Sequence, residues 1–528
     1  WSRGLGDVYK RQHHNLGNCL RDLGGTHRWQ ALHHYREAER VGLQSEDRVL
    51  SQAMVWLDLG YPIQAYDCLL RWQTTQGKQA SIERVDLLQI LLELATRLFE
   101  ADEADPIAGW CLDRLNGTGQ DKPINQLAQA VSYARLGRIE EAVSAYRVCI
   151  QRLQSDNQQI SPEEKQTLIN ASWNLACSLL KAGEMKAGWE LYEYGLQAPA
   201  KLPQRWQRAC AKLFSHNKIP IWRGEALSGK RLLLIGEQAV GDTMMFLHLL
   251  PDLLKRQALV TLAVAERLVP IYQRTYPGLS VIPTDANSEK PHDLPDADAF
   301  DYQIPCGSLP RQCLSDWLKQ SQSQKPIQPD KDKRDYFHNL YRQDLGPSLP
   351  VIGVSWRGGG HSDRIRIKSL PLEDFTDLLL GISARFVSVQ YGDVHDQVQR
   401  WQQQNIDIVH SPDVDALKDM DTWLAQVAAC DLIVSVANTT IHGAGGLNIP
   451  TLCLLSRSSD WRWVEGMPHS YWYSSVECSV QGRRGSWRHV VQDANNWVSR
   501  NWPKANPAPK DYSYLNFDHT LLKRNNVD

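Results

Sequence analysis

Residues 230–265 read KRLLLIGEQAVGDTMMFLHLLPDLLKRQALVTLAVA, and this stretch decides the fold. Its two short apolar runs, RLLLI and LVTLAVA, predict buried strands, and the amphipathic segment 243–256 between them predicts a helix. A strand, a helix and a second strand in this order imply parallel strands joined by a crossover helix. Ligands bind at the carboxyl ends of such strands, so the loop GEQAVGD after the first strand is a candidate site.

A second set of strands follows a polar, Pro-containing stretch at residues 321–333. The runs VIGVSWRG, RFVSVQYG, DLIVSVAN and TLCLLSRS each predict a buried strand that ends in a polar or glycine-containing loop. We therefore expect two doubly wound, Rossmann-like domains, at residues 216–346 and 347–500, facing each other across a cleft. The Pro-rich stretch NWPKANPAPK marks the start of a predicted exposed tail, residues 501–528.

Residues 1–215 carry a different pattern, in which small and aromatic residues recur at regular steps. One unit is LGRIEEAVSAYRVCI, with Gly137, Ala142, Tyr146 and Cys149. A second is KAGEMKAGWELYEYG, and weaker copies lie near residues 24 and 60. These units resemble tetratricopeptide repeats, whose stacked helical hairpins present a concave surface to a peptide or protein. The alternative is a plain helical domain with coincidental small residues, and both interpretations make this region all-helical.

The composition argues against several classes of function. The 528 residues are 42% hydrophobic and 22% charged with a formal net charge of -2, so there is no basic excess for nucleic acid. No apolar run approaches the roughly 20 residues that a membrane span needs. The 11 cysteines include no CxxC pair, which predicts reduced thiols in a cytoplasmic protein rather than disulfides or a zinc site. The chain opens at Trp1 without a signal-peptide pattern, and we expect it to be a fragment.

Three motifs suggest other chemistry and are set aside. GEALSGK, residues 224–230, has the spacing of a phosphate loop, but Arg231 replaces the magnesium-binding Ser or Thr and the segment precedes a strand. GAGG, residues 443–446, lacks the third glycine of a dinucleotide fingerprint. Asp296 and Asp298 form a DxD string, but in the acidic run DLPDADAFD they predict a solvated loop. We therefore expect no metal site.

The loop GEQAVGD carries the first candidate residues. Gly241 permits a tight turn, and we place Asp242 at or near the N-cap of a helix that begins at Thr243. Asp242 is either only that cap or a general base that takes the proton from an acceptor hydroxyl. Gln238, Gly241 and His248 form the candidate acceptor side of the site.

The second candidate segment is VSVANTTIHGAGG, residues 434–446. Asn438, Thr439 and Thr440 open a predicted helix, whose free backbone N–H groups suit a diphosphate without any metal. His442, one turn further on, either reaches a phosphate or fills a polar niche.

The third candidate segment is the loop after VIGVSW, with Arg357, Lys368 and the glycines at 358–360. A basic residue on a mobile loop suits a leaving group that gains negative charge as its bond to a sugar breaks. The alternative is an exposed charged loop, and it applies most to Arg364 and Arg366.

Together these segments resemble a known family. The runs IWRGEALSGKRLLLIGEQAVGDTMMFLHLLP, VIGVSWRGGGHSDRIRIKSLPLEDF and DLIVSVANTTIHGAGGLNIPTLCLLS are similar to tetratricopeptide-containing glycosyltransferases related to the bacterial heptosyltransferases of glycosyltransferase family 9. The resemblance covers residues 182–497 and implies a GT-B fold. It also implies inverting, metal-independent transfer from a nucleotide diphosphate sugar, with no other cofactor and with the donor on the C-terminal lobe.

The resemblance also implies roles for individual residues. Asp242 matches the family's catalytic Asp, and Lys368 matches its diphosphate-binding residue. The donor-binding positions are matched by Gln390, Asn438, Thr439, Thr440 and His442. Departures at Ala437, Ala239, Met245 and His248 mean that ADP-heptose cannot be assumed as the donor. A more distant similarity to protein O-GlcNAc transferases implies a protein hydroxyl as acceptor.

We therefore expect a cytoplasmic glycosyltransferase of bacterial type whose partners are a nucleotide sugar and a protein or peptide bound by the repeats. A noncatalytic scaffold with a degenerate GT-B domain is the alternative, and an epimerase-like enzyme is a third. Convergence of Asp242, Lys368 and residues 438–440 on one cleft would favour catalysis. Trp461 and Trp463 in DWRWVEG either stack on a nucleotide base or sugar, or pack under a loop.

Overall fold

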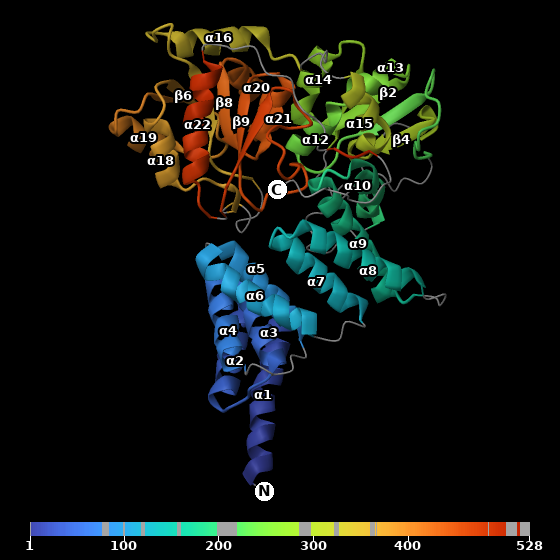
Figure 1. Cartoon of the computed structure of the whole chain (residues 1–528), viewed down its shortest axis with the longest axis vertical. Helices are drawn as coiled ribbons and strands as arrows, with labels where there is room; N and C mark the ends of the chain where they lie inside the picture. Colours follow the sequence, from blue (N-terminus) through green and yellow to red (C-terminus); the bar gives the residue numbers. More distant parts are fainter. Residues whose placement is uncertain are drawn as a thin grey trace, which may run out of the picture. The chain divides into compact units, whose positions relative to one another are not determined.

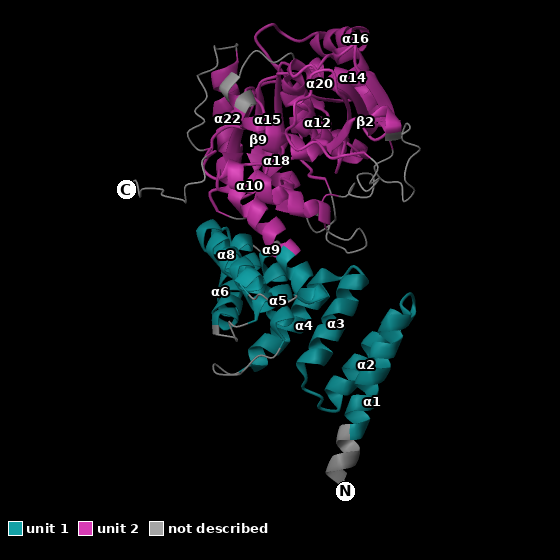
Figure 2. Ribbon diagram, turned by 90° about the vertical axis from the view of Figure 1, so that its right-hand side faces the viewer, with its two compact units in different colours: residues 1–168 teal, residues 169–528 magenta. Residues whose placement is uncertain are grey.

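The computed structural model describes residues 2–76, 84–98, 101–117, 122–155, 160–197, 208, 219–284, 297–320, 327–359, 365, 367–483, 485–502 and 515–517. The chain forms two compact units, Trp1–Leu168 and Ile169–Asp528 (Figure 2). The expected boundary at residue 215 lies outside the described residues.

The first unit consists of helices that pack in consecutive antiparallel pairs. The pairs are α1 (Ser2–Leu23) with α2 (His27–Arg40), α3 (Glu46–Asp58) with α4 (Pro62–Thr75), α5 (Val85–Leu98) with α6 (Ala101–Gly117), and α7 (Pro123–Arg135) with α8 (Ile139–Ser155). Ala142, Tyr146 and Cys149 are buried on one face of α8, as the spacing predicts. The helical repeat array expected from the sequence is confirmed (Figure 1).

A ninth helix runs from one unit into the other and forms a hairpin that packs within the second unit. This helix, α9 (Pro162–Lys181), is followed by α10 (Met185–Tyr192) and the short η1 (Glu193–Gln197). Gly183 turns the chain between α9 and α10 with φ of 85°, a left-handed conformation that favours glycine. Gly188 lets α10 approach α9, since a Cβ atom there would lie 2.6 Å from Leu180.

The first lobe of the second unit is a four-stranded parallel sheet with strand order β3-β2-β1-β4. Its strands are β1 (Arg231–Ile235), β2 (Leu259–Ala265), β3 (Ser280–Thr284) and β4 (Tyr302–Pro305). Its helices are α12 (Val240–Leu247), α13 (Leu250–Lys255), α14 (Val269–Thr275) and α15 (Leu309–Gln320), with η2 (Glu266–Leu268), η3 (Ala297–Ala299) and η4 (Cys306–Ser308). The single helix expected at 243–256 is thus two helices, and the first begins at Val240 rather than Thr243.

The second lobe is a six-stranded parallel sheet with strand order β10-β9-β8-β5-β6-β7. Its strands are β5 (Val351–Ser355), β6 (Arg385–Ser388), β7 (Ile408–His410), β8 (Leu432–Val436), β9 (Thr451–Leu455) and β10 (Val476–Val480). Its helices are α16 (Lys331–Arg342), α18 (Leu372–Leu380), α19 (His395–Gln403), α20 (Met420–Ala428), α21 (Thr439–Gly446) and α22 (Arg488–Asn501). The strand order reverses between β5 and β8, which is where doubly wound sheets bind ligands.

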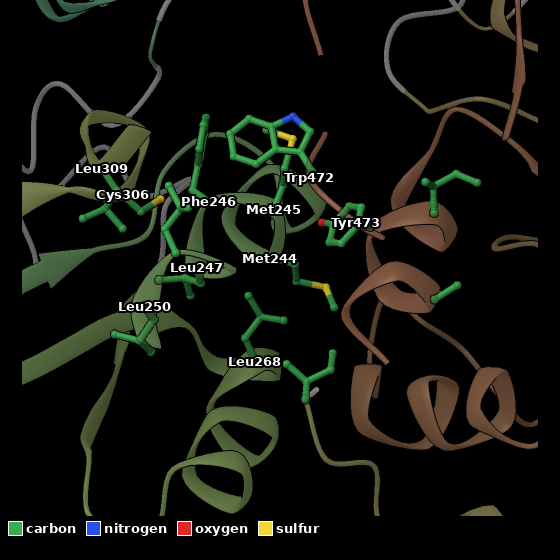
Figure 3. Packing of buried hydrophobic residues seen from close by; sticks show 14 of the residues in the cluster. Met244, Met245, Phe246, Leu247, Leu250, Leu268, Cys306, Leu309, Trp472 and Tyr473 are labelled. Atoms are coloured by element: carbon green, nitrogen blue, oxygen red, sulfur yellow. The ribbon is translucent and has the colours of Figure 1, made fainter. Parts of the chain in front are cut away.

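The two lobes share one hydrophobic core. Figure 3 shows Met244, Met245 and Phe246 of α12 gathered with Trp472 and Tyr473, which follow β9. Phe246 and Trp472 meet edge to face, with ring centroids 5.9 Å apart. The predicted fold, two Rossmann-like domains behind a helical array, is therefore confirmed. Among the described residues, no helix combines the length and the apolar character needed to cross a membrane.

Part of the expected tail, residues 501–528, packs against the second unit. Residues 515–517 are described, and the Asn516 N–H donates to the Gly183 carbonyl over 2.6 Å. The Met185 N–H donates in turn to the Asn516 carbonyl over 2.7 Å. Leu515 and Phe517 pack against the shared core, so this short segment is half-buried rather than exposed.

Gly188→Val should destabilise the second unit by about 1–3 kcal/mol, because the added side chain overlaps Leu180 in a packed interior. Urea unfolding followed by tryptophan fluorescence measures this change. Gly278→Ala is the matched control, because no atom lies within 4 Å of its added Cβ atom. Equal stability of both variants would show that α9 and α10 do not need this close approach.

Candidate functional site

The candidate site lies where loops from both lobes meet at the carboxyl ends of their strands. The loop after β1 leads into α12, and the loop after β8 leads into α21. A Cβ atom at Gly241 would lie 3.1 Å from both the Thr439 Oγ1 atom and the His442 ring. Only a residue without a side chain fits here without displacing its neighbours, so Gly241 brings the starts of the two helices together.

Asp242 lies in the first turn of α12, but its side chain does not cap that helix. The N-cap is Ala239, and it makes no side-chain hydrogen bond to the helix. Asp242 Oδ1 instead accepts a 2.6 Å hydrogen bond from Arg462 Nε in the second lobe. The interpretation of Asp242 as a cap at the start of a helix from Thr243 is therefore wrong, because the helix begins three residues earlier.

Arg462 belongs to a chain of four charged side chains that joins the lobes. Its guanidinium contacts Asp242, lies 3.1 Å from Asp460 Oδ2, and donates to Gln238 Oε1 over 3.3 Å. Lys368 Nζ donates to the same Asp460 oxygen over 2.9 Å. Asp242 and Lys368 therefore converge, connected through Asp460 and Arg462.

Burial and charge both act on this cluster. Burial alone would raise the pKa of Asp460, but the charges of Arg462 and Lys368 outweigh it and hold that pKa well below its usual value. Burial would likewise lower the pKa of Arg462, but Asp242 and Asp460 keep it above its usual value. All four side chains are therefore ionised at neutral pH, and each charge has an opposite partner.

Lys368 reaches this cluster because its segment lies against the loop after β5. A Cβ atom at Gly358 would lie 2.7 Å from the Lys368 Cβ atom, so the glycine permits the approach. The Gly358 N–H also donates to Ser369 Oγ over 3.0 Å. Gly360, Arg364 and Arg366 lie outside the described residues.

Asn438 caps α21 and ties it to β5. Its Oδ1 atom accepts a 2.9 Å hydrogen bond from the Thr440 N–H, as an N-cap side chain does. Its Nδ2 atom donates to Ser355 Oγ over 2.7 Å and to the Arg357 carbonyl over 3.1 Å. Asn438 therefore sets the position of the helix start, where Thr439 is half-buried and Thr440 is buried.

Gln390, at the end of β6, holds the loop after β5 from the other side. Its Oε1 atom accepts hydrogen bonds from Ser355 Oγ, the Trp356 N–H and the Arg357 N–H over 2.8–3.1 Å. The Arg357 guanidinium donates to the Tyr391 carbonyl over 2.9 Å and lies over the Tyr391 ring. Gln390 therefore shapes the loop, and the contacts of Arg357 are with Tyr391 rather than with the charge cluster.

His442 and His248 lie beside the tyrosine ring of Tyr473. His442 Nδ1 is 3.1 Å from the Tyr473 hydroxyl, and the His248 ring centroid is 4.9 Å from that of Tyr473. Burial lowers the pKa of each histidine to about 4, so both are neutral at neutral pH. This favours the polar niche for His442. Both also line a small cavity with Met244 and Tyr272.

Arg462 and Asp460 were not predicted, although they lie in the motif DWRW. They follow β9, which is the neighbour of β8 in the sheet, so the rule of strand carboxyl ends applies to them as well. The attention of the sequence analysis was on the tryptophans. Trp461 stacks on Phe246 at 6.2 Å and Trp463 lies over His442 at 6.5 Å, which favours packing for both.

The described residues contain no group of three or more His, Cys, Asp or Glu that could hold a metal ion. Asp298 lies in η3, and Asp296 is outside the described residues. The expectation that transfer needs no metal or cofactor stays a prediction.

His442→Gln should make the stability of the protein less dependent on pH. The unfolded chain binds a proton at His442 near its usual pKa of 6.5, whereas the folded chain binds it only near pH 4. The folded state therefore loses stability as the pH falls through this window, by about 2 kcal/mol between pH 7 and 5. Urea unfolding at both pH values measures the loss, which should shrink by this amount in the variant and stay unchanged in His338→Gln, at an exposed histidine.

No family model matches the chain. FlbA of Caulobacter vibrioides is 28% identical to it over 377 residues, which are 68% of this chain and 59% of FlbA. The chain thus spans about three fifths of the length of this curated relative.

Three solved structures show the similarities of the two regions. The E. coli ADP-heptose LPS heptosyltransferase II is 16% identical with a TM-score of 0.38, covering 51% of this chain and 99% of that chain. A glycosyl transferase of family 9 from Veillonella parvula is 14% identical with a TM-score of 0.36, covering 52% and 94%. The O-GlcNAc transferase of Thermobaculum terrenum is 12% identical with a TM-score of 0.27, covering 85% and 88%.

Proposed function

We propose that this protein is a glycosyltransferase that moves a sugar from a nucleotide diphosphate sugar to a hydroxyl acceptor. The observation that supports it most is the convergence of Asp242, Lys368 and the start of α21 at the meeting edge of two Rossmann-like lobes. A carboxylate, a cation and a helix N-terminus are the groups that such a transfer requires. The sequence resemblance of the same segments to glycosyltransferases of family 9 agrees with this proposal.

The donor binds on the second lobe in this proposal. Its diphosphate lies at the start of α21, where backbone N–H groups and the helix dipole attract negative charge. Lys368 stabilises the charge that grows on the diphosphate as its bond to the sugar breaks, in the role that a magnesium ion has in other transferases. Asn438 and Gln390 act indirectly, by holding the loop after β5 and the helix start in position.

Asp242 acts as the general base from the first lobe. The acceptor hydroxyl gives its proton to the carboxylate while its oxygen forms a bond to the anomeric carbon of the sugar. The bond from that carbon to the diphosphate breaks at the same time, and the nucleoside diphosphate leaves with the electron pair. Attack from the face opposite the leaving group inverts the configuration at the anomeric carbon.

The acceptor is a protein or peptide in this proposal. A stack of helical hairpins such as α1–α8 offers an extended surface to a polypeptide and has no evident use in the modification of a small glycolipid. The hydroxyl of a Ser or Thr side chain in that polypeptide supplies the attacking oxygen. A noncatalytic scaffold would need neither the paired charges nor the close approach at Gly241.

Nucleotide binding tests the donor site. One of ADP, UDP, GDP or CDP, without metal, should raise the melting temperature of the intact chain by about 2–5 °C at saturation. The double variant Asn438→Ala, Lys368→Ala should lose this shift, because it lacks both the helix cap and the cation. No shift with any of the four at millimolar concentration would favour the noncatalytic scaffold.

Asp242→Asn should lower transfer at least about 100-fold, because the amide cannot accept the proton of the attacking hydroxyl. Release of the nucleoside diphosphate from its sugar donor, in the presence of a peptide mixture, measures the rate. Asp413→Asn, at an exposed turn away from the site, is the matched control. Full activity of Asp242→Asn would contradict the assignment of the base.

A further inference from the structure

Arg462 makes contacts that the proposed reaction does not yet use. Its guanidinium is shared between Asp242 of one lobe and Asp460 of its own loop, and it also donates to Gln238. The side chains of Arg462 and Asp242 are only 17% and 13% exposed. Charges this deep are costly unless each has a partner, so the pairs are interdependent.

The position of Arg462 is fixed by its own loop rather than by Asp242. Its backbone N–H donates to Asp460 Oδ1 over 3.1 Å, and its guanidinium lies 4.3 Å from the centre of the Trp461 ring. Trp461 is itself packed against Phe246. Loss of the contact to Asp242 would therefore leave Arg462 in place, still paired with Asp460.

The cluster surrounds the start of α21. The charges of Asp242, Arg462, Asp460 and Lys368 all act on His442, which lies in the first turn of that helix. Gly241, next to Asp242, touches Thr439 at the helix start. Arg462 thus belongs to the same edge of the second lobe as Lys368, and Asp460 links the two cations.

We infer that Arg462 is a second cation of the donor diphosphate site, and that the diphosphate and Asp242 compete for it. The inference rests on the proposed function. The forked guanidinium binds two oxygens of a phosphate as well as it binds a carboxylate. In the empty site the two cations are balanced by two carboxylates. A diphosphate adds about two negative charges, and it takes from Asp242 the guanidinium face that now contacts Oδ1.

This exchange makes the base depend on the donor. Before the donor binds, Arg462 stabilises the negative charge of Asp242 and so weakens its ability to take a proton. After the donor binds, the carboxylate is free to accept the hydrogen bond of an acceptor hydroxyl. The donor therefore binds first and the acceptor second, which protects the donor from premature transfer to water.

Two substitutions at one ion pair separate this role from a structural one. Without metal, isothermal titration calorimetry gives the affinity of ADP, UDP, GDP and CDP for the intact chain and its variants. Arg462→Gln should weaken the bound nucleotide about tenfold or more, since it removes a charged hydrogen bond to phosphate. Asp242→Asn should strengthen it about threefold or more, because the competitor for the guanidinium has lost its charge. A salt bridge that only held the lobes together would give both variants the same sign.

Controls keep the outcomes distinct. Arg457→Gln changes a half-exposed arginine of the same loop, whose ion pair is with Glu465, and should leave the affinity unchanged. Arg462→Lys keeps the charge without the fork and should fall between the intact chain and Arg462→Gln. Unchanged binding in Arg462→Gln, or weaker binding in Asp242→Asn, would overturn the inference alone. If Arg462→Gln does not fold, the sign in Asp242→Asn decides. Failure of the intact chain to bind any of the four nucleotides would overturn the proposed function together with the inference.

Discussion

The close approach of α12 and α21 at Gly241 is the constraint on which the site depends. Both helices start at the carboxyl ends of parallel strands, β1 in one sheet and β8 in the other. Because Gly241 has no side chain, Thr439 and His442 come within reach of the loop that carries Asp242. The apolar side chains of α12 then complete the contact with Trp472 and Tyr473. A larger residue at Gly241 would separate the two starts, and with them the residues of the candidate site.

A second constraint follows from the first, because the contact buries charges. An ionised carboxylate or guanidinium inside a protein needs a partner of opposite sign. Asp242, Arg462, Asp460 and Lys368 meet this need in a linear chain across the lobes. The neutral neighbours are satisfied differently. Gln390 and Asn438 hold backbone groups of the loop after β5, and His442 contacts the Tyr473 hydroxyl.

The order of strands and helices, and three of the loops at the site, could be predicted from sequence because they depend on local patterns. Apolar runs that end in GEQ, WRG and ANT mark the ends of β1, β5 and β8. The partners of the side chains could not be predicted, because they depend on which strands are neighbours in the sheet. Arg462 follows β9, and nothing local indicates that it meets Asp242, 220 positions earlier in the chain. The early start of α12 was missed because Ala239 gives no capping signal.

The half-buried segment at residues 515–517 has a consequence for how the chain can be shortened. Asn516 forms a one-residue parallel bridge with Glu184 and bonds to the backbone on both sides of the α9–α10 turn. That turn supports the aromatic side chains of Trp189 and Tyr192, which reach Trp461. A protein expressed only as far as α22 would therefore have a helix hairpin with an open backbone edge next to the loop of Arg462. Preparations intended for crystals or for ligand screens should keep residues beyond Phe517, even though few of them belong to a helix or strand.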